Sequence, residues 1–144
     1  MKQQDFSNHA RFVPAFHFVA LPILLLNFVD QIYRIVHLGF SLDTVTALLL
    51  AIALILVALY ARLFALTVQD RVIRLEMRLR LEQILPAELR PRIPQFTVNQ
   101  LVALRFASDA ELPELTRRVL EEKMNDRKAI KQLIKTWKAD YLRA

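Results

Sequence analysis

The sequence contains no cysteine and only one glycine, Gly39. Without cysteine, disulfide bonds, thiolate catalysis and iron–sulfur ligation are excluded, and nothing can be inferred about the redox compartment. Because glycine is scarce while Leu, Ala, Arg and Glu are abundant, the composition predicts an all-α protein. The sequence also lacks a Walker loop, a G-x-S-x-G or H-E-x-x-H motif and a glycine-rich phosphate cradle. No general acid/base pair stands out, so we expect a protein that is not an enzyme and holds no cofactor.

Hydrophobic residues, in contrast, make up 55% of the 144 residues, against about 45–50% in soluble domains. Residues 12–29 and 44–61 are two stretches without a formal charge. At about 1.5 Å per residue, each covers roughly 27 Å, close to the ~30 Å hydrocarbon core of a bilayer. The pattern predicts an integral membrane hairpin of two transmembrane helices, at about 12–36 and 42–66, joined by a short external link.

The first of these stretches is interrupted by prolines. Pro14 is expected in the first helical turn, and Pro22 is expected to kink the helix or loosen one turn. One alternative is a cleaved signal peptide, since Lys2 and Arg11 precede the apolar run; its length and the lack of a small-residue cleavage site before Asp30 favour an uncleaved anchor. A second alternative is a soluble helical domain, which would have to bury both stretches.

The distribution of Lys and Arg predicts the orientation. Two of the twenty lie in residues 1–11, one lies in the link at 30–43, and seventeen lie in residues 62–144. We therefore expect both termini in the cytoplasm.

A polar face interrupts the outer half of the first helix. At 100° per residue four side chains fall in one narrow arc, namely Asn27, Asp30, Gln31 and Arg34. Asp30 and Arg34 are four residues apart and could pair along the helix. The face is either the helix end emerging into headgroups and water or an intramembrane polar surface against a partner or a wet crevice.

The second span carries a face of small residues, which permit close helix contact. Its members are Ala47, Ala51, Ala58, Ala61 and Ala65. This helix-packing face could contact the first helix of the hairpin or form a homo-oligomer interface. Both alternatives remain open.

No helix breaker lies between Ser41 and Leu85, which predicts that the second span continues into the cytoplasm as one long helix. Two apolar stripes follow this extension on nearly opposite sides. One consists of Val68, Val72, Leu75 and Leu79, and the other of Leu66, Ile73, Met77, Leu81 and Ile84. Since an ordinary surface helix has one apolar face, two packing neighbours are expected: the C-terminal helices of the same chain and a second subunit.

Local ion pairs at four-residue spacing are also expected on this extension, Asp70 with Arg74 and Glu76 with Arg80.

Two basic rows are possible contacts for lipid headgroups or an acidic partner, although a solvated helix face would show the same pattern. They are Arg71, Arg74 and Arg78, and Lys128, Lys131, Lys135 and Lys138.

The sequence divides into a cytoplasmic tail at 1–11, the hairpin at 12–66, a connecting helix and proline-containing loop at 67–96, and a cytoplasmic helical domain at 97–144. Thr97 and Gln100 form a capping box for a short helix. A second helix is expected from about Pro113 to Met124. Asn125 or Asp126 would cap a last helix, whose apolar face would comprise Ile130, Leu133, Ile134, Trp137 and Tyr141.

Two kinds of ligand are disfavoured by the sequence. Residues 97–144 carry ten Lys or Arg and seven Asp or Glu, a modest excess without a helix-turn-helix signature, so no nucleic-acid binding is expected. His9 and His17 are candidates for a metal or haem site. Their spacing matches no standard site, and a buried histidine is more often simply hydrogen-bonded.

Four segments resemble an uncharacterised family of small bacterial two-helix membrane proteins, the domain of unknown function 6526. They are NHARFVPAFHF at 8–18, VQDRVIRLEMRLRL at 68–81, LRFASDAEL at 104–112 and IKTWKADYLR at 134–143. The resemblance implies a bacterial inner-membrane setting and places His9, Arg11, Pro14 and His17 in a family motif. It implies no activity, so no residue acquires a role from it.

These observations favour a non-catalytic membrane protein that acts through protein interaction, as an oligomeric scaffold or as an accessory subunit of a larger membrane complex. Its expected partners are membrane lipid and either further copies of itself or other membrane proteins. One alternative is a small oligomeric channel or transporter lined by the polar face. Another is a haem- or metal-binding membrane protein that uses His17.

Overall fold

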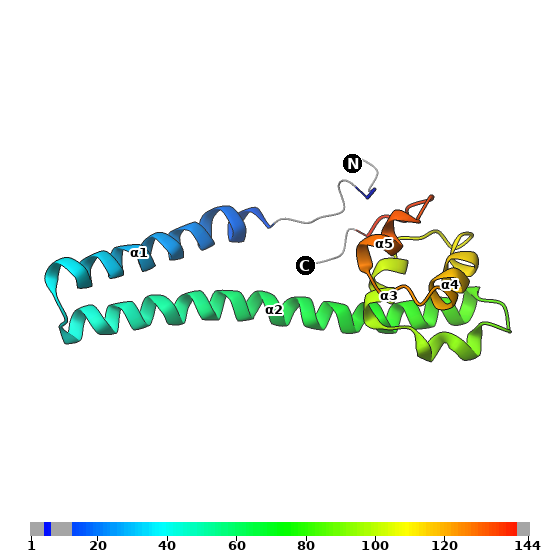
Figure 1. Ribbon diagram of the computed structural model, residues 1–144, viewed down its shortest axis with the longest axis horizontal. Helices are drawn as coiled ribbons and strands as arrows, with labels where there is room; N and C mark the ends of the chain where they lie inside the picture. The colour runs from blue at the N-terminus through cyan, green and yellow to red at the C-terminus, as the bar shows by residue number, and fades with distance from the viewer. Residues whose placement is uncertain (1–4, 7–12, 141–144) are drawn as a thin grey trace. The chain divides into compact units, whose positions relative to one another are not determined.

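The computed structural model describes residues 5–6 and 13–140, and within those ranges it contains helices and no strand (Figure 1). The chain divides between Ala65 and Leu66 into two compact units. One unit holds the hairpin, and the other holds the C-terminal helices together with the end of the long helix α2. The expected all-helical fold is confirmed for the described residues.

The first helix of the hairpin begins with a widened segment. Residues Ala15–Ala20 form a π-helical segment, η1, which continues directly into α1, Leu21–Leu38. Pro22 lies in the first turn of α1 and has no N–H to donate to the turn before it. The loosening that Pro22 predicts is thus present as the π-helical turns that precede it.

A three-residue turn closes the hairpin. Gly39 adopts a φ of 82°, which favours glycine, and this is the only glycine of the chain. Ser41 and Thr44 then cap the next helix reciprocally, because the backbone N–H of each donates to the side-chain oxygen of the other, at 2.9 and 3.2 Å. The side chain of Thr44 also donates to the carbonyl of Gly39. Local chemistry alone therefore fixes the turn.

The helix α2 runs without interruption from Leu42 to Ile84. This confirms the expectation of one long helix. Its 43 residues correspond to about 65 Å at the usual rise, roughly twice the thickness of a hydrocarbon core.

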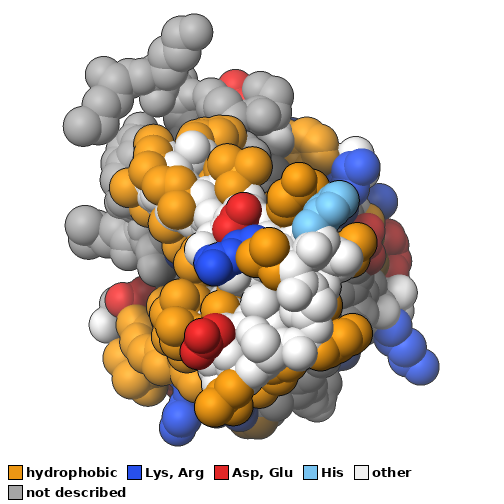
Figure 2. Space-filling model, turned by 90° about the vertical axis from the view of Figure 1, so that its left-hand side faces the viewer, with side chains coloured by type: hydrophobic (Ala, Val, Ile, Leu, Met, Phe, Trp, Pro, Cys, Tyr) orange, Lys and Arg blue, Asp and Glu red, His pale blue; other side chains and the backbone are white. Residues whose placement is uncertain are grey.

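Two helices are long and apolar enough to cross a membrane, residues Ala15–Leu38 and Leu42–Ile84. Only 6% and 11% of the residues in their most apolar stretches are buried. Seen from the end with the hairpin turn, hydrophobic side chains lie at the surface around acidic, basic and histidine side chains (Figure 2). Side chains such as Leu26, Leu50 and Val57 are each 60% exposed or more, which is unlike the core helix of a soluble domain.

The C-terminal unit packs short helices against one side of α2. They are η2 (Arg90–Gln95), α3 (Val98–Leu104), α4 (Leu112–Glu121) and α5 (Arg127–Gln132), and α3 packs against both α4 and α5. Ile73, Met77 and Leu81 of α2 contribute to its core. Fully buried members of this core include Phe106, Leu101, Leu104, Leu112, Val119 and Ile130.

Two predicted helix starts are confirmed in this unit. Thr97 and Gln100 form the capping box at the start of α3, and the side-chain amide of Gln100 also donates to the carbonyl of Met124 at 2.7 Å. Asp126 caps α5, accepting hydrogen bonds from the N–H groups of Lys128 and Ala129.

The predicted length of the last helix is wrong, since α5 ends at Gln132 rather than near Tyr141, which lies outside the described residues. The following segment is extended and bonded to the α3–α4 loop. Both oxygens of Glu111 accept backbone N–H groups, those of residues 135 and 136, and Trp137 pairs with Ala107 in an isolated bridge. These tertiary hydrogen bonds replace the helical ones.

Candidate functional site

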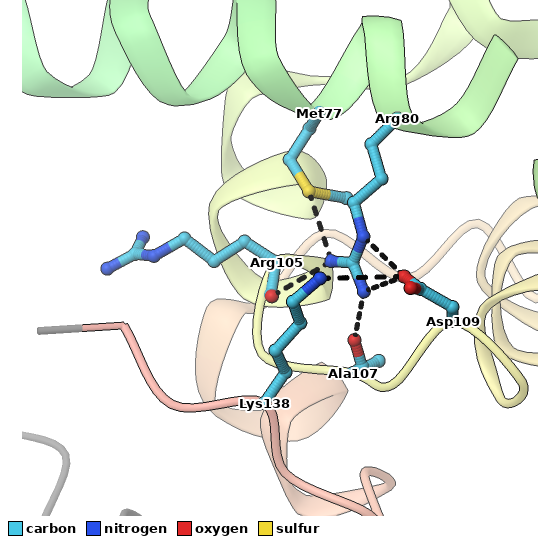
Figure 3. A network of polar contacts seen from close by, with 6 residues as sticks. All are labelled: Met77, Arg80, Arg105, Ala107, Asp109 and Lys138. Atoms are coloured by element: carbon cyan, nitrogen blue, oxygen red, sulfur yellow. Dashed lines mark hydrogen bonds and ion pairs between the residues drawn. The ribbon is translucent and has the colours of Figure 1, made fainter. Parts of the chain in front are cut away.

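Three segments far apart in the sequence meet at the carboxylate of Asp109. They are the end of α2, the α3–α4 loop and the extended segment after α5, represented by Arg80, Asp109 and Lys138 (Figure 3). All three belong to segments that carry the family resemblance. The segments that carry the resemblance therefore contact one another in the fold; we call such a contact between segments a joint.

All three nitrogens of the Arg80 guanidinium group donate hydrogen bonds in this joint. Its Nε donates to Oδ1 of Asp109 at 2.8 Å, and its terminal nitrogens donate to the carbonyls of Arg105 at 3.1 Å and Ala107 at 2.7 Å (Figure 3). The side chain of Arg80 is 17% exposed. An arginine is suited to this place because its planar fork serves several acceptors at once, which a lysine cannot do. The two backbone carbonyls lie just after α3, so Arg80 connects the start of the α3–α4 loop to α2.

Asp109 is the exposed end of the same network. Its carboxylate lies 2.6 Å from a terminal nitrogen of Arg80 and 3.7 Å from the Lys138 ammonium. The hydrogen bond from Arg80, helped by the nearby charges of Arg80 and Lys138, lowers the pKa of Asp109 below its ordinary value. The carboxyl group is therefore ionised at neutral pH and is paired with cations, not poised to act as a general acid.

Arg105 makes a second joint to the C-terminal segment. Its Nε donates to Asp140 at 2.9 Å, and its guanidinium lies over the Phe106 ring, 4.3 Å from the centroid. The Phe106 ring in turn packs against Trp137, with 5.1 Å between the centroids. Residues 137–140 are thus held against α3 by an ion pair and an aromatic contact.

A third joint secures the start of α5 to α2. Arg127 donates to Asp70 at 2.9 Å and to Asn99 at 2.8 Å. The local pairs expected on α2 are therefore wrong: Asp70 pairs with Arg127 rather than with Arg74, and the partner of Arg80 is Asp109 instead of a residue of its own helix. Asp70 and Arg80 find their partners by long-range packing, which helical spacing cannot reveal.

Two shallow grooves lie beside these joints. One, of about 360 Å³, is lined by Glu76, Met77, Arg80, Arg105, Lys138, Ala139 and Asp140. The other, of about 520 Å³, includes Glu111, Glu114, Arg118 and Lys135 in its lining. Several of these charged side chains already form ion pairs, Arg105 with Asp140 and Arg118 with Glu122. The C-terminal unit is thus held together by ion pairs. The sequence analysis expected Arg80 to pair with Glu76, and it included Asp109 only within a segment of the family resemblance.

The expected polar face of α1 is split by the structure. Gln31 is buried, its Nε2 donates to Asp30 at 3.2 Å, and its buried Oε1 has no hydrogen-bond partner among the described residues. Asn27, Asp30 and Arg34 are exposed, and the expected pair between Asp30 and Arg34 does not form. Most of this face therefore points away from the rest of the hairpin.

The alanine face of α2 is divided in a similar way. Ala51 is buried within the hairpin unit, at 2% exposure, and Ala47 and Ala58 are half-buried, whereas Ala61 and Ala65 are exposed. Ala58 and Ala61 also line an apolar groove of about 390 Å³ with Val13, Phe16, Ala20 and Arg62. The alanine face is thus buried in the hairpin around Ala51 and exposed at Ala61 and Ala65.

The two basic rows differ in their geometry. Arg71 and Arg74 are exposed on α2, while Arg78 is half-buried and its Nε has no partner within the described part of the chain. The lysines do not form one helical row, because Lys135 and Lys138 follow the end of α5. Lys131 lies over the Phe106 ring at 5.1 Å, and Lys128 is exposed.

The histidine candidates show no metal-site geometry in the described residues. No group of three or more His, Cys, Asp or Glu side chains that could hold a metal occurs there. The ring Nδ1 of His17 lies 2.9 Å from the carbonyl and 3.1 Å from the N–H of Val13, at the start of the first helix. His9 and Arg11 lie outside the described residues.

The two apolar stripes of α2 have opposite environments. In one stripe Ile73, Met77 and Leu81 are buried under the C-terminal helices and Ile84 is partly buried, whereas Leu66 is 37% exposed. The stripe on the other side is open: Val68, Val72, Leu75 and Leu79 are 59%, 48%, 61% and 58% exposed. We call these four residues the open stripe.

These features define the class: an all-helical protein with two helices long and apolar enough to cross a membrane and a C-terminal unit held by ion pairs. The chain belongs to the Family of unknown function (DUF6526), whose model matches residues 1–144. No curated protein and no solved structure matches the chain.

Proposed function

We propose that the chain is a two-span protein of the bacterial inner membrane, with both termini in the cytoplasm. The length of the two apolar helices and the exposure of their side chains support this arrangement, because such a surface is stable in lipid and unfavourable in water. The excess of Lys and Arg in residues 62–144 supports the orientation. On this topology α2 leaves the bilayer and continues as a helix in the cytoplasm.

The function that the geometry supports best is protein interaction without catalysis, as an oligomeric scaffold or an accessory subunit of a larger membrane complex. The open stripe is the observation that carries this proposal. Its four apolar side chains lie on the charged part of α2, beyond the apolar span, where lipid would not cover them. An apolar surface of this kind marks a protein-binding site.

Chemical cross-linking in native membranes, followed by purification in a mild detergent and mass measurement, tests this function. We expect a stoichiometric complex, with either further copies of the chain or other proteins. The double variant Val72→Glu and Leu75→Glu should lose the complex, because charges replace the apolar contacts. Arg74→Glu, which alters an exposed residue outside the stripe, is the matched control and should retain it. A strictly monomeric wild-type protein without partners would refute the proposal.

A channel or transporter formed by several hairpins is the second candidate. The outward-facing polar side chains of α1 favour it, since Asn27 and Asp30 are exposed on an otherwise apolar helix and polar groups in a membrane seek partners or water. Purified protein in liposomes should then conduct ions, and Asn27→Leu combined with Asp30→Leu should abolish the flux. Flux that is unchanged by the double variant would remove this candidate.

A further inference from the structure

The open stripe has the spacing of a coiled-coil seam. Its residues, Val68, Val72, Leu75 and Leu79, follow one another at intervals of four, three and four. This is the alternation of a and d positions in a heptad repeat, with an average of 3.5 residues. In this register Val72 and Leu79 are a positions, and Val68 and Leu75 are d positions. A β-branched residue at a followed by Leu at d, as in Val72 and Leu75, favours two strands.

The register continues toward the membrane span. Ala58, Ala61 and Ala65 precede Val68 at intervals of three, four and three residues. They are small residues, which allow two helices to approach closely inside a bilayer. Ala58 and Ala61, however, line the hairpin's own groove beside Val13, Phe16 and Ala20, so the seam between copies is the open stripe itself.

The charged residues beside the stripe select the direction of pairing. Arg71 and Arg78 occupy g positions, and Glu76 and Gln83 occupy e positions. In a parallel pair a g residue faces the e residue five positions later on the other helix. Arg71 of one copy would then face Glu76 of the other, and Arg78 would face Gln83. An antiparallel pair would instead bring g residues together and oppose arginines.

From this pattern we infer that the open stripe binds a second copy of the same chain, forming a parallel, in-register, two-stranded coiled coil along α2. The inference deepens the proposed function, on which it rests, by naming the partner. Two copies inserted in one membrane with the same orientation present α2 in parallel. The opposite side of α2 is already covered by the C-terminal helices, through Ile73, Met77 and Leu81, so the two interfaces do not compete.

The length of the seam is consistent with a membrane-tethered dimer. Residues 68–79 span less than two heptads, and so short a helix pair is marginal in isolation. Anchoring both copies in one bilayer raises their effective concentration and removes much of the cost of association. We therefore expect the seam to form in membranes and to weaken on dilution in detergent.

Disulfide cross-linking tests the seam directly, because the wild-type chain has no cysteine. Single variants Val68→Cys, Val72→Cys, Leu75→Cys and Leu79→Cys are made in the full chain and oxidised mildly in native membranes. In a parallel coiled coil each a or d residue faces its own copy, with Cα atoms near the roughly 4.4–6.8 Å that a disulfide requires. All four should yield a dimer band at least about tenfold stronger than that of Arg74→Cys, an exposed residue outside the seam. Equal bands at all five positions, or none, would overturn the inference.

A charge exchange tests the parallel register. Arg71→Glu alone and Glu76→Arg alone should each weaken the dimer band of the Val72→Cys variant, because like charges would then face each other. The double exchange should restore it. Failure of the double exchange to restore the band while both single variants weaken it would overturn the parallel pairing.

The outcome also separates this inference from the function on which it rests. If the chain purifies in a stoichiometric complex with a different protein and the cysteines show no seam, the homodimer is wrong and the interaction function stands. If the wild-type chain forms no complex of any kind in native membranes, both are wrong. A seam-specific dimer supports both.

Discussion

At the scale of single residues, Arg80 joins more parts of the molecule than its position on a helix suggests. Its side chain serves one carboxylate and two backbone carbonyls, all from the region around the α3–α4 loop. Removing it leaves those acceptors without their donor in a largely buried place, which is more costly than losing an exposed ion pair.

We expect Arg80→Ala to lower the free energy of unfolding of the C-terminal unit by about 1–3 kcal/mol. Arg74→Ala, at an exposed position on the same helix, should change it by less than about 0.5 kcal/mol. Trp137 is the only tryptophan and lies in this unit, so its fluorescence during denaturant unfolding in detergent measures both. Equal stability of the two variants would contradict the role assigned to Arg80.

The lowered pKa of Asp109 predicts a stability that depends on pH. Because the pKa is lower in the folded state, the ionised carboxylate stabilises the fold above the unfolded value of about 3.9, and this contribution is lost as the pH falls through the folded value. Asp109→Asn should therefore be less stable than wild type at neutral pH. The gap between their Trp137 unfolding midpoints should close as the pH falls below about 4; a gap that stays constant down to pH 2 would contradict this.

At the scale of elements, the two sides of α2 should respond differently to the same substitution. Leu81 is fully buried, so Leu81→Ala should destabilise the C-terminal unit by about 2–5 kcal/mol. Leu79 is 58% exposed, and Leu79→Ala should leave the stability of a monomer in detergent nearly unchanged while it weakens association in membranes. Thermal unfolding in detergent, read alongside cross-linking in membranes, distinguishes them. A large loss of monomer stability in Leu79→Ala would show that the open stripe is covered within one chain.

Elements with local causes were predictable from the sequence. The helix α2 follows from a long run of helix formers without a breaker, and α3 and α5 begin at recognisable caps. The end of α5 was not predictable, because backbone N–H groups after Gln132 donate to the Glu111 carboxylate and the same segment exchanges backbone hydrogen bonds with the α3–α4 loop. Apolar periodicity continues past that point, but tertiary hydrogen bonds override it.

The candidate sites were predictable to a lesser extent, for the same reason. The apolar stripes of α2 are a local periodicity, and the sequence indicated both of them. Which stripe the chain covers depends on long-range packing, as do the partners of Asp70 and Arg80. The split of the α1 polar face likewise depends on the side of the helix that meets the hairpin, which buries Gln31 and leaves Asn27 exposed.

At the scale of the whole molecule, the proposed topology accounts for the length of α2 and for the charge distribution together. A helix of about 65 Å is roughly twice as long as a hydrocarbon core of about 30 Å is thick, so much of α2 must project beyond the core. The seventeen Lys and Arg of residues 62–144 lie on the part that would project into the cytoplasm. The short link around Gly39 would then be the only described segment on the outer side.

The most direct test of this account is the labelling of single cysteines with a membrane-impermeant maleimide in intact spheroplasts. The wild-type chain has no cysteine, and both Phe40, at 86% exposure in the hairpin link, and Ala87, after α2, are exposed. The proposed topology predicts that Phe40→Cys is labelled from outside, while Ala87→Cys is labelled only after the membrane is permeabilised. Labelling of Ala87→Cys in intact spheroplasts, or release of the protein into the soluble fraction, would contradict it.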